Sequence, residues 1–164
     1  MKRWPSPAYA VAIDFRVPIA FAYAWCTDYR PYDGRLLGTP YERWVLRRDA
    51  RSVVFEDLGK AVDHWWWRRT TVALQPPDRW TADSIGNVRE ARLEYRLTPL
   101  SEERTRFALT MHRRPTGVHP RQPPKKELES ELRQMWSRYG KAMERDYRRS
   151  RPPRSSTGRT RRAP

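Results

Sequence analysis

The chain has very little cysteine and histidine. Its 164 residues include one cysteine, Cys26, and three histidines, His64, His112 and His119. A single thiol excludes an internal disulfide framework, and these few side chains form no closely spaced set of the kind that holds structural zinc. We therefore expect no metal ion in this protein.

Long apolar runs are absent as well. The longest, at residues 19–26, is far shorter than the ~20 residues that a membrane-spanning helix needs. The opening residues, Met-Lys-Arg-Trp-Pro, lack the apolar stretch of a signal peptide. We expect a cytoplasmic protein that folds, at this length, as a single domain with a substantial core.

The chain also lacks the catalytic motifs that can be recognised in a sequence. It has no glycine-rich phosphate loop, no HExxH helix, no nucleophile elbow and no Walker sequence. We expect no cofactor, and no motif assigns a catalytic role to any residue. An enzyme built on this chain would depend on acid–base groups inside a cavity, so whether it is an enzyme stays open.

Positive charge is abundant. The net charge is +15, but residues 148–164 contribute seven arginines and no acid, which leaves +8 on the preceding 147 residues. Clustered arginine is typical of phosphate-binding proteins, although a chain with five lysines, three isoleucines and one asparagine also fits the codon usage of a GC-rich genome. Residues 150–164 have almost no apolar content, so we expect a disordered basic tail there and a short N-terminal extension at residues 1–7.

Alternation of apolar and polar residues with a period of two predicts seven strands. They fall at residues 8–15, 41–48, 51–58, 62–75, 79–85, 89–98 and 104–113. Such strict alternation is typical of antiparallel strands with one face in water. Pro18, followed by the compact apolar run at residues 19–26, predicts a short helix after the first strand.

Residues 125–149 are predicted to form a long helix. Its apolar residues recur at intervals of three and four, through Leu128, Leu132, Trp136 and Tyr139, and therefore share one stripe. Acidic residues lie near its start and arginines near its end, as the helix dipole favours. The proline-rich connection before it, residues 113–124, is either a flap over a cavity or an inert surface loop.

This order of elements resembles the helix-grip fold of the START-like, or SRPBCC, superfamily. The resemblance is carried by Phe15-Arg16-Val17-Pro18 leading into a helix that ends Trp25-Cys26-Thr27-Asp28, and by the hairpin sequences at residues 72–80 and 95–107. Those hairpins are similar to the polyketide cyclase/dehydrase branch, and the resemblance covers residues 8–149. It implies an α+β domain in which a curved antiparallel sheet wraps around the C-terminal helix, with a deep cavity for a hydrophobic molecule. It implies no catalytic residue, because the superfamily shares none.

The apolar faces of the strands and the long helix must bury one another, and we expect them to line or floor this cavity. The expected lining residues are Trp66, Tyr95, Phe107 and Leu109 from the strands and Trp136, Tyr139 and Met143 from the helix.

Strand parity brings two polar side chains to the same face. If Val72 and Leu74 point inward, so do Arg68 and His64. An inward Arg68 needs either a core acid or a ligand carbonyl or carboxylate, whereas a bulge before Trp67 would turn it to solvent. His64 is a candidate general base, although a histidine near a strand end is more often exposed or structurally bonded.

Two functions fit these features. The first is binding of a hydrophobic small molecule such as a polyketide- or lipid-like compound, either as a carrier or as a cyclase or dehydratase. The second is an interaction protein that attaches to nucleic acid or an anionic membrane through its arginine-rich surface and tail. A cavity of ~300–1,000 Å³ would favour the first function, and a filled core would favour the second.

Overall fold

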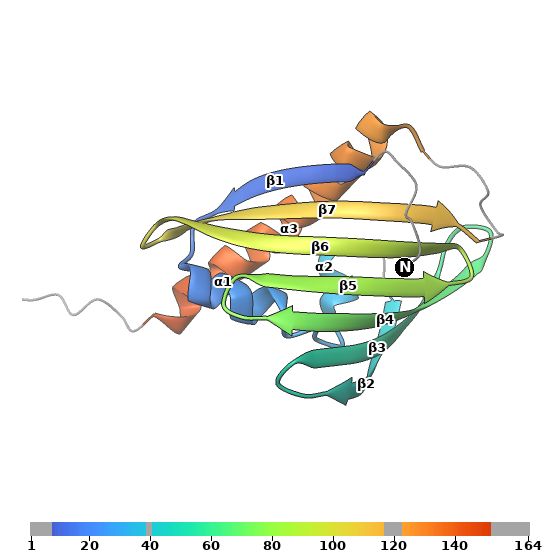
Figure 1. Cartoon of the computed structure of the whole chain (residues 1–164), viewed down its shortest axis with the longest axis horizontal. Coiled ribbons are helices and arrows are strands. Elements are labelled where there is room, and N and C mark those ends of the chain that lie inside the picture. Colours follow the sequence, from blue (N-terminus) through green and yellow to red (C-terminus); the bar gives the residue numbers. More distant parts are fainter. Residues whose placement is uncertain (1–7, 39–40, 117–122, 152–164) are drawn as a thin grey trace, which may run out of the picture.

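The computed structural model describes residues 8–38, 41–116 and 123–151. These residues form a seven-stranded antiparallel sheet and three helices (Figure 1). In chain order the elements are β1 (Tyr9–Phe15), α1 (Ile19–Cys26), α2 (Asp33–Leu36), β2 (Tyr41–Arg48), β3 (Ser52–Lys60), β4 (Trp65–Gln75), β5 (Arg79–Gly86), β6 (Arg89–Ser101), β7 (Arg104–Pro115) and α3 (Lys125–Ser150).

The sheet is a meander from β2 to β7, with β1 added beside β7 to give the order β1-β7-β6-β5-β4-β3-β2. The sheet curves, and α3 crosses one of its faces diagonally, with α1 and α2 on the same side (Figure 1). The α+β helix-grip architecture predicted from the sequence is confirmed.

Alternation of side chains explains why these segments pair as they do. In β7, Thr105, Phe107, Leu109 and Met111 are buried, and the residues between them are more exposed. In β4 the alternation continues without a register shift against β3, so no bulge precedes Trp67. Trp65 and Trp67 are 60% and 45% exposed, so these two tryptophans lie on the outer face.

The long helix α3 also covers the edge of the sheet. Side chains of α3 hydrogen-bond to backbone groups in or just after β1, which has no strand on its other side. The contacts are Glu129 with the Ala10 N–H, Arg133 with the Ala12 carbonyl and Glu144 with the Arg16 N–H, at 2.8, 2.9 and 2.9 Å. These bonds fix the diagonal position of the helix on the sheet.

The structure corrects some predicted boundaries. β7 continues to Pro115, so Arg113 belongs to this strand and the connection to α3 is shorter than the predicted residues 113–124. Residues 117–122 of that connection, the predicted extension at residues 1–7 and residues 152–164 of the predicted tail lie outside the described residues. Among the described residues, no helix is both long enough and apolar enough to cross a membrane.

Candidate functional site

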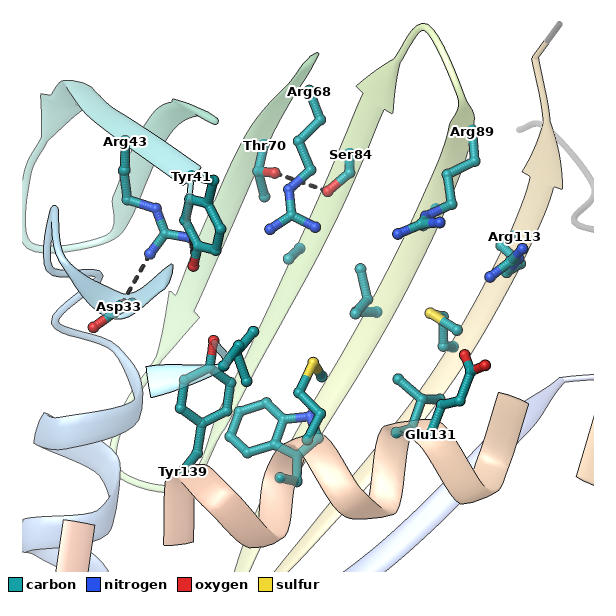
Figure 2. Close-up of a pocket in the computed structure, with 18 of the residues that line it drawn as sticks. Asp33, Tyr41, Arg43, Arg68, Thr70, Ser84, Arg89, Arg113, Glu131 and Tyr139 are labelled. Carbon is teal, nitrogen blue, oxygen red and sulfur yellow. Dashed lines mark hydrogen bonds and ion pairs between the residues drawn. The ribbon is translucent and has the colours of Figure 1, made fainter. Parts of the chain in front are cut away.

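A cavity of about 680 Å³ lies between the inner face of the sheet and α3. Figure 2 shows its upper wall, formed by side chains that point from the strands toward the helix, and its lower wall, formed by α3 itself. Part of the lining is apolar and part is charged.

The apolar wall is largely aromatic. The rings of Trp80 and Tyr95 stack with their centroids 4.8 Å apart and their planes 9° apart. Trp136 from α3 meets Tyr95 edge-on at 5.9 Å, and Trp25 of α1 meets Tyr139 at 6.1 Å. The Nε1–H of Trp136 is buried and has no acceptor among the described residues. Flat, rigid rings of this kind suit a flat apolar ligand.

The charged wall is a row of arginines that crosses the sheet. Arg43, Arg68, Arg89 and Arg113 come from β2, β4, β6 and β7, and all four line the cavity. Figure 2 shows Arg68 and Arg89 extending from their strands toward α3, and Arg43 reaching toward Asp33 of α2. The row lies at the end of the sheet nearest the start of α3, where β7 ends and β6 begins (Figure 1).

Two of these arginines share one buried carboxylate. Asp57 of β3 lies directly between Arg43 and Arg68 in the strand register, and its side chain is fully buried. Arg43 donates to Oδ1 of Asp57 at 2.7 Å and to Oδ2 at 3.1 Å, and Arg68 donates to Oδ2 from Nε and Nη2 at 2.9 and 2.7 Å. This cluster has the geometry that a buried ion pair needs, because every oxygen of the acid is hydrogen-bonded.

Asp33 and Tyr41 complete the network around Arg43. Arg43 Nη1 donates to Asp33 of α2 at 2.9 Å, and Nη2 donates to the Tyr41 hydroxyl at 3.1 Å. Burial raises the pKa of Asp33 to about 6, although the charge of Arg43 acts against this shift. Burial also acts to lower the pKa of Arg43, but the hydrogen bond to Asp57 and the charges of Tyr41, Asp57 and Asp33 together outweigh it and hold that pKa above its ordinary value.

Arg89 and Arg113 lie in different surroundings. Burial, the charge of Arg113 and the charge of Arg68 together lower the pKa of Arg89 to about 10, and burial likewise lowers the pKa of Arg113. Glu131 of α3 acts in the opposite direction on both. Figure 2 shows Glu131 pointing from the helix toward this pair. Arg89 and Arg113 therefore place positive charge at this end of the cavity, although burial disfavours it.

Neutral polar groups complete the lining. The hydroxyls of Thr70 and Ser84, on neighbouring strands, lie 2.8 Å apart. Burial, together with the nearby Tyr41, raises the pKa of Tyr139, so this phenol stays protonated at neutral pH. The cavity thus presents donors and acceptors as well as charge.

The structure brings together five of the eight predicted ligand-binding residues. Trp66, Arg68, Tyr95, Trp136 and Tyr139 line the cavity. Arg68 faces inward, as parity predicts, and its partner is the core acid Asp57. Trp66 lies across Gly59, where a Cβ would come within 2.3 Å of the indole, so only glycine fits beneath this ring.

The other three predicted residues, Phe107, Leu109 and Met143, are fully buried in the packed core and do not line the cavity. The reason is the diagonal course of α3. At Gly140 the helix comes so close to the sheet that a Cβ would lie 2.6 Å from the Phe15 ring. The space between helix and sheet is therefore closed at this end and open toward the start of α3.

His64, the candidate general base, lines the cavity just before β4. Its Nδ1 lies 2.6 Å from the Oδ1 of Asp63, and its side chain is 18% exposed. A carboxylate at Nδ1 is the arrangement that orients an imidazole for proton transfer, but it is also an ordinary structural bond. The catalytic role of His64 stays a prediction.

Two arginines that line the cavity, and the buried acid that holds Arg43 and Arg68, were not predicted as site residues, although the alternation contains a signal for them. Arg89 shares parity with Ala91 and Tyr95, and Arg113 shares parity with Met111, so both belong to the inner faces of their strands. Asp57 likewise follows the buried Phe55 at a spacing of two. At each of these positions, a charged residue lies an even number of residues from a buried one on the same strand, and it therefore points to the same face.

No family model matches the chain, and no curated protein is similar to it in sequence. Solved structures are similar in fold. The Zhui aromatase/cyclase from Streptomyces sp. R1128 matches with a TM-score of 0.67 at 13% identity, over 87% of this chain and 94% of that chain. A START superfamily protein from Mycobacterium smegmatis matches with a TM-score of 0.61 at 10% identity, over 87% of this chain and 97% of that chain.

A third structure, the di-domain aromatase/cyclase StfQ of the steffimycin biosynthetic pathway, matches with a TM-score of 0.65 at 14% identity, over 85% of this chain and 46% of that chain. Identities this low report on the fold, and fold alone does not establish an activity. On these likenesses and on its own sheet and helix arrangement, the chain has the START-like, or SRPBCC, helix-grip fold.

Proposed function

We propose that this protein binds a hydrophobic small molecule in the cavity between its sheet and α3, as a carrier or as a cyclase or dehydratase. The observation that carries the proposal is the cavity itself. Its volume of about 680 Å³ is in the middle of the ~300–1,000 Å³ range of small-molecule sites. A filled core would have favoured the alternative, an interaction protein that uses only its surface.

The lining favours a ligand with a flat apolar body and some oxygen atoms. Trp80, Tyr95 and Trp136 offer ring faces and edges to such a body. The hydroxyls of Thr70 and Ser84, which also line the cavity, offer hydrogen bonds to ligand oxygen atoms. Polyketide-like compounds combine these features, and two of the similar structures are aromatase/cyclases by name.

Turnover of a bound ketone would need a base and a group that stabilises an enolate. His64, oriented by Asp63, is the base that we propose, and it would remove a proton next to a carbonyl. Arg68, held by Asp57 at the cavity wall, would stabilise the negative charge that then forms on the oxygen. His64→Ala should then abolish turnover without abolishing binding.

Filling the cavity tests the proposal. Ala82 of β5 is buried and lines the cavity, whereas Ala73 of β4 is exposed on the outer face of the same sheet. The uncharged dye N-phenyl-1-naphthylamine, which fluoresces in apolar sites, should bind the natural protein and Ala73→Trp equally. Ala82→Trp should abolish the signal, because the indole occupies the space for the ligand.

A second filling variant protects this test against misfolding. Ala91→Phe on β6 adds volume to the same cavity, and thermal melting checks that each variant is folded. Dye binding that persists unchanged in both folded filling variants would place the apolar site elsewhere and refute the proposal.

A further inference from the structure

Arg89 differs from the other arginines near the sheet end of the cavity. Arg43 and Arg68 are bound to Asp57. Arg89 has no hydrogen bond or ion pair from its side chain within residues 8–38, 41–116 and 123–151. It is more than a third exposed because it faces a cavity that water enters, yet the surrounding walls remove enough water to lower its pKa.

Arg89 lies where its side chain points into the cavity. It opens β6 on the parity of Ala91 and Tyr95, both of which line the cavity. Figure 2 shows its guanidinium reaching from the strand toward α3. Arg113 pairs with Ala91 and Arg89 pairs with Pro115, so the two arginines are diagonal neighbours on one face of the β6–β7 pair.

Among the described residues, Arg89 lacks the acid partner that Arg43 and Arg68 have. Arg43 and Arg68 are matched by Asp33 and Asp57. Glu131 of α3 is an acid whose charge acts on both Arg89 and Arg113. Two further groups that line the cavity, Arg138 and His64, have partners elsewhere, at the carbonyl of Leu37 and at Asp63.

An apolar passage joins this charged end to the aromatic wall. Leu93 and Met111 from the strands and Leu132 and Met135 from α3 line the cavity. Each belongs to the same inner face as the arginine or aromatic residues of its own element. A molecule that occupies the whole cavity would therefore place one end against Arg89 and its body against apolar side chains.

We infer that Arg89, with Arg113 beside it, binds a carboxylate, and that the ligand is an amphipathic acid with one negative charge and an apolar body. The inference rests on the proposed function, because it assigns the head group of the same ligand. A carboxylate would give Arg89 the charge-assisted hydrogen bonds that it lacks. The second negative charge of a dianion such as a phosphate would be repelled by Glu131, which points toward this pair (Figure 2).

The test compares ligands that differ only in the head group. Fluorescence titration of the full chain would use pyrenebutyrate, the uncharged pyrenebutanol and the dianionic pyrenebutylphosphonate. We expect the acid to bind about tenfold more tightly than the alcohol, which is the ratio expected for one added charge-assisted hydrogen bond. The phosphonate should bind no more tightly than the acid.

Arg89→Met should remove the preference for the acid while keeping the affinity for the alcohol. The matched control is Arg96→Met, which removes the same charge from the exposed outer face of the same strand and should keep the preference. The melting temperature of Arg89→Met should be unchanged or higher, because the change removes a partly desolvated charge.

Other results would overturn the inference. Equal binding of acid and alcohol by the natural protein, or an unchanged preference in Arg89→Met, would remove the carboxylate site and leave the proposed function standing. A fall in melting temperature together with lost alcohol binding would assign Arg89 to folding instead. Tighter binding of the phosphonate than of the acid would contradict a singly charged head group, and failure of all three ligands to bind would count against the proposed function as well.

Discussion

Arg68 and Asp57 are direct cross-strand partners, and both Nε and Nη2 of Arg68 donate to the same carboxylate oxygen. The same acid also pairs with Arg43 on its other side. Asp57 is 1% exposed, so two guanidinium groups depend on one buried carboxylate. We therefore expect the stability of the fold to depend strongly on Asp57, which lies behind the cavity wall.

Asp57→Asn should lower the free energy of unfolding by about 3–5 kcal/mol, because it leaves buried arginine charge uncompensated. Glu56→Gln is the matched control. Glu56 is the next residue, faces outward and pairs with Arg69, which is 53% exposed, so its loss should cost about 1 kcal/mol or less. Urea denaturation measures both, and equal effects of the two changes would contradict the buried role of Asp57.

Asp33 should make stability depend on pH. Its pKa rises from 3.8 to about 6 on folding, so the unfolded chain loses this proton first as the pH rises. Relative to Asp33→Asn, the natural protein is therefore most stable below pH 3.8. Its free energy of unfolding then falls, relative to the variant, by up to about 3 kcal/mol as the pH rises through about 6. Paired urea titrations of the two proteins across this range measure the difference. A difference that grows with pH would show that the pKa is lowered instead.

Gly140→Ala should destabilise the protein although alanine favours helices. A Cβ at Gly140 would lie 2.6 Å from the buried Phe15 ring, so α3 must move away from the sheet. We expect a loss of about 1–3 kcal/mol, which outweighs the gain of about 1 kcal/mol in helix propensity. Lys141→Ala, at the exposed neighbouring position, should change stability by no more than about 0.5 kcal/mol. A stabilised Gly140→Ala would mean that the helix does not make this close contact.

Removal of residues 152–164 should leave folding intact and reduce binding to anionic polymers. The cut falls after Arg151, because Arg151 contacts Glu103 and the Tyr147 ring, whereas the removed segment contributes four arginines with almost no apolar content. The melting temperature should change by less than about 4 °C, and DNA binding at low salt should weaken. DNA binding that survives both the deletion and about 0.5 M salt would place the contact on the domain itself.

The sequence predicts the strands and α3 well because their pattern is periodic and turn residues separate them. The same parity turns Arg68 inward, and the structure has it there with the acid partner that parity arguments leave unspecified. Asp57 could be matched to Arg68 only through the β3–β4 register, which a sequence does not give directly.

Sequence periodicity did not separate cavity residues from core residues. Three residues predicted to line the cavity lie in the packed core: Phe107, Leu109 and Met143. Periodicity identifies the face of a helix or strand but not the distance between facing elements. That distance depends here on Gly140, which brings α3 onto Phe15 and closes one end of the space. Arg89 and Arg113 were missed for another reason. Their place in the alternation turns their side chains inward, whereas a charged residue usually lies on an outer face.

The most direct test is native mass spectrometry of the protein purified from its own cells, beside Ala82→Trp purified in the same way. The natural protein should carry one additional small molecule per chain, and dissociation of that molecule should yield a compound with an apolar body. Ala82→Trp, folded but with its cavity filled, should appear at the mass of the chain alone. A natural protein found only at the unliganded mass, with the same spectrum as Ala82→Trp, would contradict the ligand-binding role of the cavity.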